Sequence, residues 1–232
     1  MTKTWITAHS GCEDTAENSM DSIRTGISLG ADCVDVDVRL APDGTLVLSH
    51  DMCEECANLV TLEQAFEAVA AAPVSINCDL KEYAALEAVL ALAEKCGIGR
   101  EKLIFSGSVD VRRLMEDPSV VRRSRVFLNS EELCRYMMDG NPGSREEQVE
   151  FFMENMAQIA AFMRRLGVEA LNAPYWYLND ESIAALRGLG VELSLWTVND
   201  PEDMRWLLKR DILNVTTRNV RVAAELRTVE EN

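Results

Sequence analysis

The sequence alternates short apolar runs, typical of β-strands, with longer runs of helical periodicity from one end to the other. Eight of the strand-like runs fit an alternating pattern of strand and helix, the βα pattern. These eight runs begin at Trp5, Cys33, Val74, Leu103, Arg125, Ala170, Glu192 and Leu213. Eight such units within 232 residues are typical of a closed parallel barrel. We therefore expect an α/β fold, a (β/α)8 TIM barrel, as a single domain over residues 1–232.

One strand-like run falls outside this pattern and predicts a β-hairpin after the second strand. Pro42-Asp43-Gly44 is a tight-turn signal between the run 33–38 and the run 45–50. The second run should therefore return antiparallel to the first.

Polar capping residues predict where three helices begin. Thr61 and Gln64 form a capping box at the start of one helix, and Ser144 with Glu147 opens a long helix that runs to about Leu166. Asn18 is interpreted as the N-cap of the first helix.

The composition excludes several classes of partner. The formal net charge of −16 repels nucleic acid and anionic membranes, and an anionic substrate would need a cation at its site. No apolar stretch reaches the roughly 20 residues that cross a bilayer, and the start of the chain lacks the apolar region of a secretory signal. Seven cysteines, an odd number, suit a reducing cytoplasm, so we expect a cytoplasmic protein without membrane insertion. The oligomeric state is not predicted.

The only two histidines and three aspartates lie at or near the ends of predicted strands. Asp35 and Asp37 are two residues apart on one strand, so their side chains point to the same face. Asp79 ends the next strand, His9 ends the first, and the hairpin brings His50 roughly opposite Asp37. Clustered carboxylates hold divalent cations, and imidazole transfers protons near neutral pH. This arrangement predicts metal-assisted hydrolysis of a phosphate ester.

Neighbouring residues leave alternatives open. Asp51 could orient the imidazole of His50. Lys81 could hold a phosphate oxygen or could form a plain ion pair with Asp79. The aromatic cluster around Trp176 could line a substrate pocket or plug the barrel rim.

A C-x-x-C pair, Cys53 and Cys56, has no second pair at zinc spacing. It is interpreted as two ordinary thiols, with redox sensing as the alternative.

Six motifs, in this order and spacing, resemble the glycerophosphodiester phosphodiesterase family over nearly the whole chain. They are His9-Ser10-Gly11, Ala16-Glu17-Asn18-Ser19, Asp35-Val36-Asp37-Val38-Arg39-Leu40, Asp43-Gly44-Thr45-Leu46-Val47 leading into His50-Asp51, Asp79-Leu80-Lys81, and Trp196-Thr197-Val198-Asn199. The resemblance implies a (β/α)8 barrel that hydrolyses a small glycerophosphodiester to glycerol 3-phosphate and an alcohol with a divalent cation, Mg²⁺ or Ca²⁺.

The resemblance also implies roles for single residues. The general acid and base would be His9 and His50, in that order. Asp35, Asp37 and Asp79 match metal-binding positions. The matches to substrate-binding positions are Lys81, Trp196, Ser10 and Glu17.

Four features depart from the family pattern. Ser10 stands where arginine is usual, and a hydroxyl cannot replace a guanidinium charge. Asp35 and Asp79 stand where glutamate is usual, Thr217 stands for an aspartate, and the insertion after Asp51 is short. These departures favour two alternatives: an impaired barrel that binds phosphate ligands, or a hydrolase of a different phosphodiester.

Overall fold

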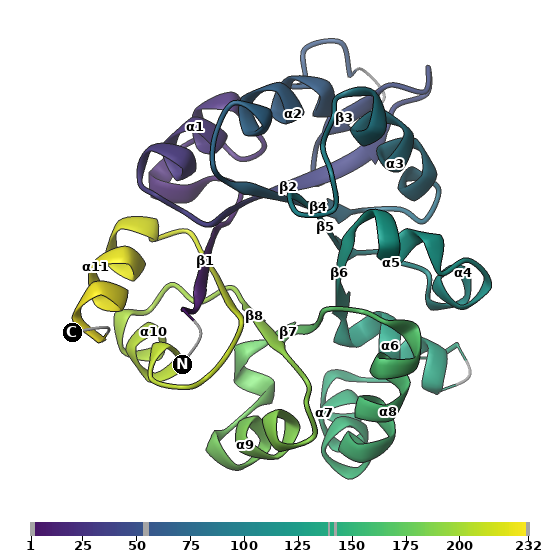
Figure 1. The fold of residues 1–232 in the computed structure, drawn as a ribbon, viewed down its shortest axis with the longest axis vertical. Coiled ribbons are helices and arrows are strands. Elements are labelled where there is room, and N and C mark those ends of the chain that lie inside the picture. Colours follow the sequence, from purple (N-terminus) through teal and green to yellow (C-terminus); the bar gives the residue numbers. More distant parts are fainter. Residues whose placement is uncertain (1–2, 53–55, 139, 142, 231–232) are drawn as a thin grey trace.

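The computed structural model is a closed barrel of parallel strands surrounded by helices (Figure 1). It describes residues 3–52, 56–138, 140–141 and 143–230. The strands are β1 (Trp5–Ala8), β2 (Cys33–Leu40), β3 (Leu46–Leu48), β4 (Ser75–Leu80), β5 (Leu103–Gly107), β6 (Arg125–Asn129), β7 (Ala170–Pro174), β8 (Leu193–Trp196) and β9 (Asn214–Thr217).

Helices follow the strands and cover the outside of the barrel (Figure 1). The α-helices are α1 (Met20–Ser28), α2 (Leu62–Ala70), α3 (Ala85–Lys95), α4 (Val111–Glu116), α5 (Ser119–Arg123), α6 (Ser130–Met137), α7 (Arg145–Glu154), α8 (Met156–Leu166), α9 (Asp180–Gly188), α10 (Pro201–Leu208) and α11 (Val220–Glu230). Two short 3₁₀ helices are η1 (Cys12–Asp14) and η2 (Tyr175–Tyr177). Among the described helices, none combines the length and the apolarity that a bilayer span requires.

The strand order is β1-β9-β8-β7-β6-β5-β4-β2-β3, and pairing of β1 with β2 closes the ring. Eight strands are parallel, and β3 pairs antiparallel with β2 outside the ring. The predicted TIM barrel and its hairpin are therefore confirmed.

The barrel interior has distinct layers because alternate side chains of each strand point inward. At the N-terminal ends of the strands, a buried apolar cluster contains Cys33, Ile104, Phe127 and Ala170. Above it, hydroxyl and amide groups are joined by hydrogen bonds from strand to strand. This polar belt includes Thr7, Asn77, Ser106, Asn129, Asn172, Ser194 and Asn214. The cavity described below lies above the belt, so the belt supports its floor.

Outward-facing side chains form the larger core. Val34, Val36 and Val38 on β2 are buried in the cluster that joins the barrel to its helices. Burying such a side chain contributes about 1.5–3 kcal/mol. The alternation of valine and aspartate on β2 therefore fixes which residues face the interior.

The predicted helix starts are partly right. Thr61 and Ser144 both form complete capping boxes, as expected. The N-cap of α1 is Ser19, whose hydroxyl accepts from the backbone N–H of Ser22, so the interpretation of Asn18 as the cap is wrong. The predicted long helix 144–166 is two helices, which meet at Asn155.

The cysteine interpretation needs one correction. Cys56 is disulfide-bonded, so it is not an ordinary thiol. Cys53, the other half of the predicted pair, lies outside the described residues. Five cysteines among the described residues are free.

Candidate active site

A cavity of about 630 Å³ opens at the C-terminal ends of the strands. Active sites of TIM barrels lie at this end. Eight of the nine residues predicted for the site line the cavity: His9, Glu17, Asp35, Asp37, His50, Asp79, Lys81 and Trp196. The ninth, Ser10, does not.

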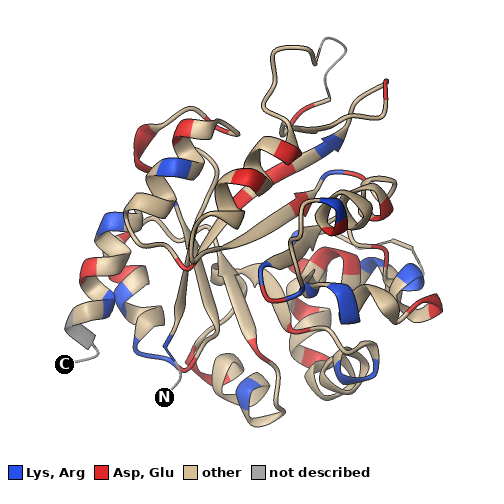
Figure 2. Cartoon of the chain, turned by 45° about the horizontal axis from the view of Figure 1, so that its top comes forward, with Lys and Arg blue, Asp and Glu red and all other residues tan. Residues whose placement is uncertain are grey.

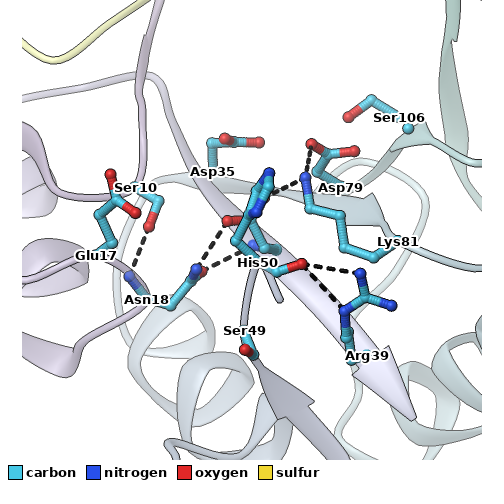
Figure 3. A network of polar contacts seen from close by, with 12 residues as sticks. Ser10, Glu17, Asn18, Asp35, Arg39, Ser49, His50, Asp79, Lys81 and Ser106 are labelled. Carbon is cyan, nitrogen blue, oxygen red and sulfur yellow. Dashed lines mark hydrogen bonds and ion pairs between the residues drawn. The ribbon is translucent and has the colours of Figure 1, made fainter. Parts of the chain in front are cut away.

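Strand register explains why the acidic residues meet. β2 and β4 pair in parallel with Asp35 opposite Asn77 and Asp37 opposite Asp79. Both β2 aspartates are buried, with 7% and 5% of their surface exposed. The side chains of Asp35, Asp79 and Lys81 converge on one space in Figure 3.

Lys81 neutralises part of this acidic cluster. Its Nζ lies 2.6 Å from Oδ1 of Asp37 and 2.8 Å from Oδ2 of Asp79. Burial alone would lower the pKa of Lys81, but the two carboxylates raise it above its usual value. Burial also acts to raise the pKa of Asp37, but the charge and hydrogen bond of Lys81 outweigh it and lower that pKa. The alternative of an ion pair with Asp79 is thus confirmed, and the pair extends to Asp37.

The other two carboxyl groups are less well compensated. Burial raises the pKa of Asp35 to about 7, although His9 and Lys81 act against this shift. Its Oδ1 accepts a 2.6 Å hydrogen bond from the side-chain amide of Asn77. Burial likewise raises the pKa of Asp79, whose Oδ1 is buried without a hydrogen-bond partner.

Asn18 holds Asp37 in place. Its side-chain Nδ2 donates to Oδ2 of Asp37 (2.7 Å), and its Oδ1 accepts from the backbone N–H of the same aspartate (2.9 Å). Figure 3 shows Asn18 reaching from the loop before α1 towards β2. The loop residue therefore positions a carboxylate, which is why it is not available as a helix cap.

Both histidines are anchored through Nδ1. Nδ1 of His9 lies 2.8 Å from the backbone carbonyl of Ser10, and Nδ1 of His50 lies 3.0 Å from a carboxylate oxygen of Asp51. Since an ionised carboxylate only accepts hydrogen bonds, this geometry assigns the proton to Nδ1 in the neutral ring of His50. Nδ1 of His9 lies between an acceptor, the Ser10 carbonyl, and a donor, Nε of Arg218 at 3.4 Å. A neutral ring with its proton on Nδ1 can accept a proton at Nε2, and the imidazolium that forms can deliver it.

The hairpin fixes the backbone at His50. Nε and Nη2 of Arg39 both donate to the carbonyl oxygen of His50, at 3.1 and 2.9 Å. Ser49 N–H also donates to the carbonyl oxygen of Asp37. Figure 3 shows the fork of Arg39 against this carbonyl. β2 thus supplies both carboxylates and the arginine that positions the histidine.

Ser10 faces away from the cavity. The residue as a whole is only 1% exposed. Its hydroxyl oxygen accepts a 2.6 Å hydrogen bond from the backbone N–H of Asn18. The serine therefore supports the loop that carries Asn18.

The aromatic cluster lies at the rim. Trp196 lines the cavity, and Trp176 packs edge-on against it with ring centroids 6.1 Å apart. Trp176 itself is half exposed, and the guanidinium of Arg145 lies 4.6 Å from the centre of its ring. This placement fits the rim interpretation rather than a pocket wall.

Other polar and charged residues line the cavity beside the nine predicted for the site. They include Asn77, Ser106, Ser108, Asn129, Glu131, Glu132, Asn172, Thr197, Thr216 and Arg218. Most lie at the C-terminal ends of strands, and this position is the signal that could have found them. Glu131 and Glu132 both have a raised pKa because they are partly buried.

The acidic cluster suits an oxygen-preferring cation in its donor chemistry. The buried, unpartnered Oδ1 of Asp79 is an acceptor that such a cation would satisfy. As the side chains stand, no three His, Cys, Asp or Glu residues among those described are grouped to hold a metal ion. In this arrangement Lys81 contacts two of the carboxylates, Asp37 and Asp79.

Comparison with known proteins finds a matching family model and a similar curated protein. Residues 9–56 match the model of the glycerophosphoryl diester phosphodiesterase family. A glycerophosphodiester phosphodiesterase of Caldanaerobacter subterraneus is 23% identical over 93% of this chain and 94% of its own length.

Solved structures agree. The glycerophosphodiester phosphodiesterase of Thermotoga maritima has a TM-score of 0.71 and 26% identity, over 97% of this chain and 99% of that one. A phosphodiesterase of Oleispira antarctica was solved with sn-glycerol 3-phosphate. It has a TM-score of 0.70 and 16% identity, over 97% of this chain and 96% of that one. In sequence and in fold, the chain is therefore similar to glycerophosphodiester phosphodiesterases over 93% of its length or more, and its segment 9–56 matches the model of that family.

Proposed function

We propose that this protein hydrolyses glycerophosphodiesters to glycerol 3-phosphate and an alcohol. The observation that carries the proposal is the meeting of both histidines with three carboxylates and a lysine in one cavity at the catalytic end of a barrel. The similarity to a phosphodiesterase solved with glycerol 3-phosphate supports the same product.

The chain's own residues supply the proton transfers. In the proposed reaction, Nε2 of one histidine, neutral at the start, takes the proton from the attacking oxygen, and the other histidine, which starts as the imidazolium, gives its Nε2 proton to the leaving alkoxide and ends neutral. Their Nδ1 contacts, to the Ser10 carbonyl and to Asp51, hold both rings in a fixed orientation. Lys81 offsets negative charge that builds on the phosphate in the transition state.

We also propose a divalent cation, Mg²⁺ or Ca²⁺, held by Asp35, Asp37 and Asp79. When bound, it would supply the positive charge that polarises the phosphate. The buried, unpartnered Oδ1 of Asp79 supports this proposal. Burial also raises the pKa of Asp35 and of Asp79, and a bound cation would offset this cost of ionisation.

The test is an assay of product. The purified protein, first treated with a chelator, is incubated with a panel of glycerophosphodiesters with and without added Mg²⁺ or Ca²⁺. We expect glycerol 3-phosphate to be released only when a cation is present. Binding of the same compounds without any product would favour a phosphate-binding barrel, and turnover of other phosphodiesters alone would favour a different substrate class.

A further inference from the structure

Arg218 is a cavity residue for which the reaction outlined above has no role. Among the described cavity-lining residues, the Lys and Arg side chains are Lys81 and Arg218. The ammonium of Lys81 is already engaged by Asp37 and Asp79. These two contacts leave one of the three N–H donors of the ammonium, whereas the guanidinium of Arg218 has five N–H donors.

Strand register places Arg218 beside His9. β1 pairs in parallel with β9, with Ala8 opposite Thr217, so the next residue of each strand follows in register. The backbone N–H of His9 donates to the carbonyl oxygen of Thr217 (2.8 Å). As a result, Nε of Arg218 lies 3.4 Å from Nδ1 of His9.

The backbone at Arg218 is fixed on two sides. Its N–H donates to Oδ1 of Asn199 (2.9 Å), and its carbonyl oxygen accepts from the N–H of Glu13 (2.9 Å). The side chain is less confined, with 43% of its surface exposed, and Nη2 forms an ion pair with Glu17. Five N–H donors belong to a guanidinium, so hydrogen atoms on Nη1 and Nη2 remain for a ligand.

We propose that Arg218 binds the phosphate of the substrate next to His9, and that Glu17 positions its guanidinium. A planar guanidinium offers two parallel N–H donors, which suit two phosphate oxygens. Ser10, the residue next to His9 in the chain, cannot serve, because its hydroxyl is buried and bonded to the Asn18 backbone. The inference rests on the proposed function, since it assigns a residue to the same reaction.

The experiment measures the affinity for sn-glycerol 3-phosphate by titration calorimetry, in wild type and in folded variants. Arg218→Gln should weaken binding on the order of tenfold to a hundredfold, because a charged hydrogen-bond donor to the phosphate is lost. Arg218→Lys should weaken it several-fold, since the charge remains but the fork is lost. Arg221→Gln is the matched control: its guanidinium pairs with Glu13, outside the residues that line the cavity, and it should leave affinity unchanged.

A double variant separates two explanations for a loss. Arg218→Gln alone leaves the carboxylate of Glu17 without its partner, and this charge could repel the phosphate. Glu17→Gln combined with Arg218→Gln removes that carboxylate as well, so we expect the double variant to bind as weakly as Arg218→Gln. Recovery of wild-type affinity in the double variant would show that repulsion by Glu17 caused the loss, and would overturn the assignment. So would an affinity of Arg218→Gln within twofold of wild type.

Failure of the two proposals can be told apart. If wild type releases no glycerol 3-phosphate in the product assay but binds it through Arg218, the hydrolase proposal fails and the assignment of Arg218 stands. If wild type is active and Arg218→Gln binds normally, only the assignment fails. Should Arg218→Gln not fold, Arg218→Lys decides, and wild-type affinity in that variant would overturn the proposal.

Discussion

Asp35 is a buried carboxyl group whose pKa is raised to about 7, chiefly by burial. Its folded-state pKa lies above its ordinary value near 4, so the folded chain binds this proton more tightly than the unfolded chain. Ionisation of Asp35 therefore costs stability, and the cost grows as pH rises from about 4 to about 7.

Asp35→Asn should remove this cost. In chelator, we expect the variant and wild type to melt alike near pH 4. The variant should gain at least about 1 kcal/mol, or roughly 2–4 °C, by pH 8. Asp43→Asn is the control: hydrogen bonds from Thr45 lower the pKa of this exposed carboxyl group, so its pH trend has the opposite sign. Melting curves with no pH-dependent difference would contradict the assigned environment of Asp35.

Lys81 stabilises the acidic cluster when no other cation is present. Lys81→Met should lower the stability in chelator by about 3 kcal/mol, because it leaves carboxylates uncompensated. Added Mg²⁺ or Ca²⁺ should raise the melting temperature of this variant more than that of wild type. Lys95→Met, which removes an exposed ion pair with Glu63, should leave the melting temperature nearly unchanged. An equal response to cation in wild type and Lys81→Met would disprove this role of the lysine.

Residue types and spacing predicted most of the site, but they could not predict two side-chain directions. Asn18 precedes a helix and has the composition of a cap, yet tertiary contact with Asp37 determines its orientation. Ser10 follows His9, and its hydroxyl turns inward to the loop rather than outward to the cavity. Both outcomes depend on how a loop packs against a strand, which local sequence does not specify.

At the scale of elements, β4 and β5 approach each other closely at their C-terminal ends. Gly107 ends β5 with φ of +72°, and a Cβ atom there would lie 1.9 Å from Oδ1 of Asp79 and 2.4 Å from the carbonyl oxygen of Leu80. Glycine therefore allows the carboxylate of Asp79 to take its place in the cavity.

Gly107→Ala should destabilise the protein by more than about 3 kcal/mol, because it combines a strained φ with a clash. Glycerophosphodiester turnover should fall as well, since Asp79 must move. Gly44 in the hairpin turn has φ of +89° but no atom within 4 Å of such a Cβ, so Gly44→Ala should cost only about 1–2 kcal/mol. Equal losses of stability in urea unfolding would show that the close approach is unimportant.

The order of elements followed from periodicity, whereas helix breaks did not. The apolar and polar pattern over 144–166 is helical throughout, yet α7 ends and α8 begins around Asn155, whose side chain donates to the carbonyl oxygen of Phe151. A side-chain hydrogen bond to the backbone competes with the helical ladder at this point. The short helices α5 and α6 were not predicted, since five to eight residues carry little periodicity.

At the scale of the whole molecule, the strongly negative charge opposes the chemistry of the cavity. Acidic residues are spread over the helices around the barrel (Figure 2), and the formal net charge is −16. An anionic substrate must approach against this field, while a zwitterionic one is repelled less.

Salt should therefore affect substrates differently. Raising ionic strength from about 0.01 M to 0.15 M shortens the screening length from about 30 Å to 8 Å. With the cation saturating, we expect kcat/KM for a glycerophosphodiester with a neutral alcohol group to rise several-fold. The value for one with a cationic alcohol group, which has no net charge, should change less. A fall in kcat/KM for the anionic substrate would contradict this account of the field.

The layered interior was the least predictable large-scale feature. The positions of the strands could be predicted from the apolar runs along the sequence. The hydrogen-bonded belt beneath the cavity could not, because it depends on the register of strands that are far apart in the sequence. Thr7 and Asn214, for example, are 207 residues apart and joined by a 2.7 Å hydrogen bond. Only closure of the barrel brings them together.

Turnover by variants of the two histidines tests the central claim most directly. The claim is that the imidazoles at the mouth of the barrel transfer protons during cleavage of a glycerophosphodiester. His9→Asn and His50→Asn should each lower kcat about 10²- to 10⁴-fold, with melting temperatures close to that of wild type. Wild-type turnover in either folded variant would contradict it.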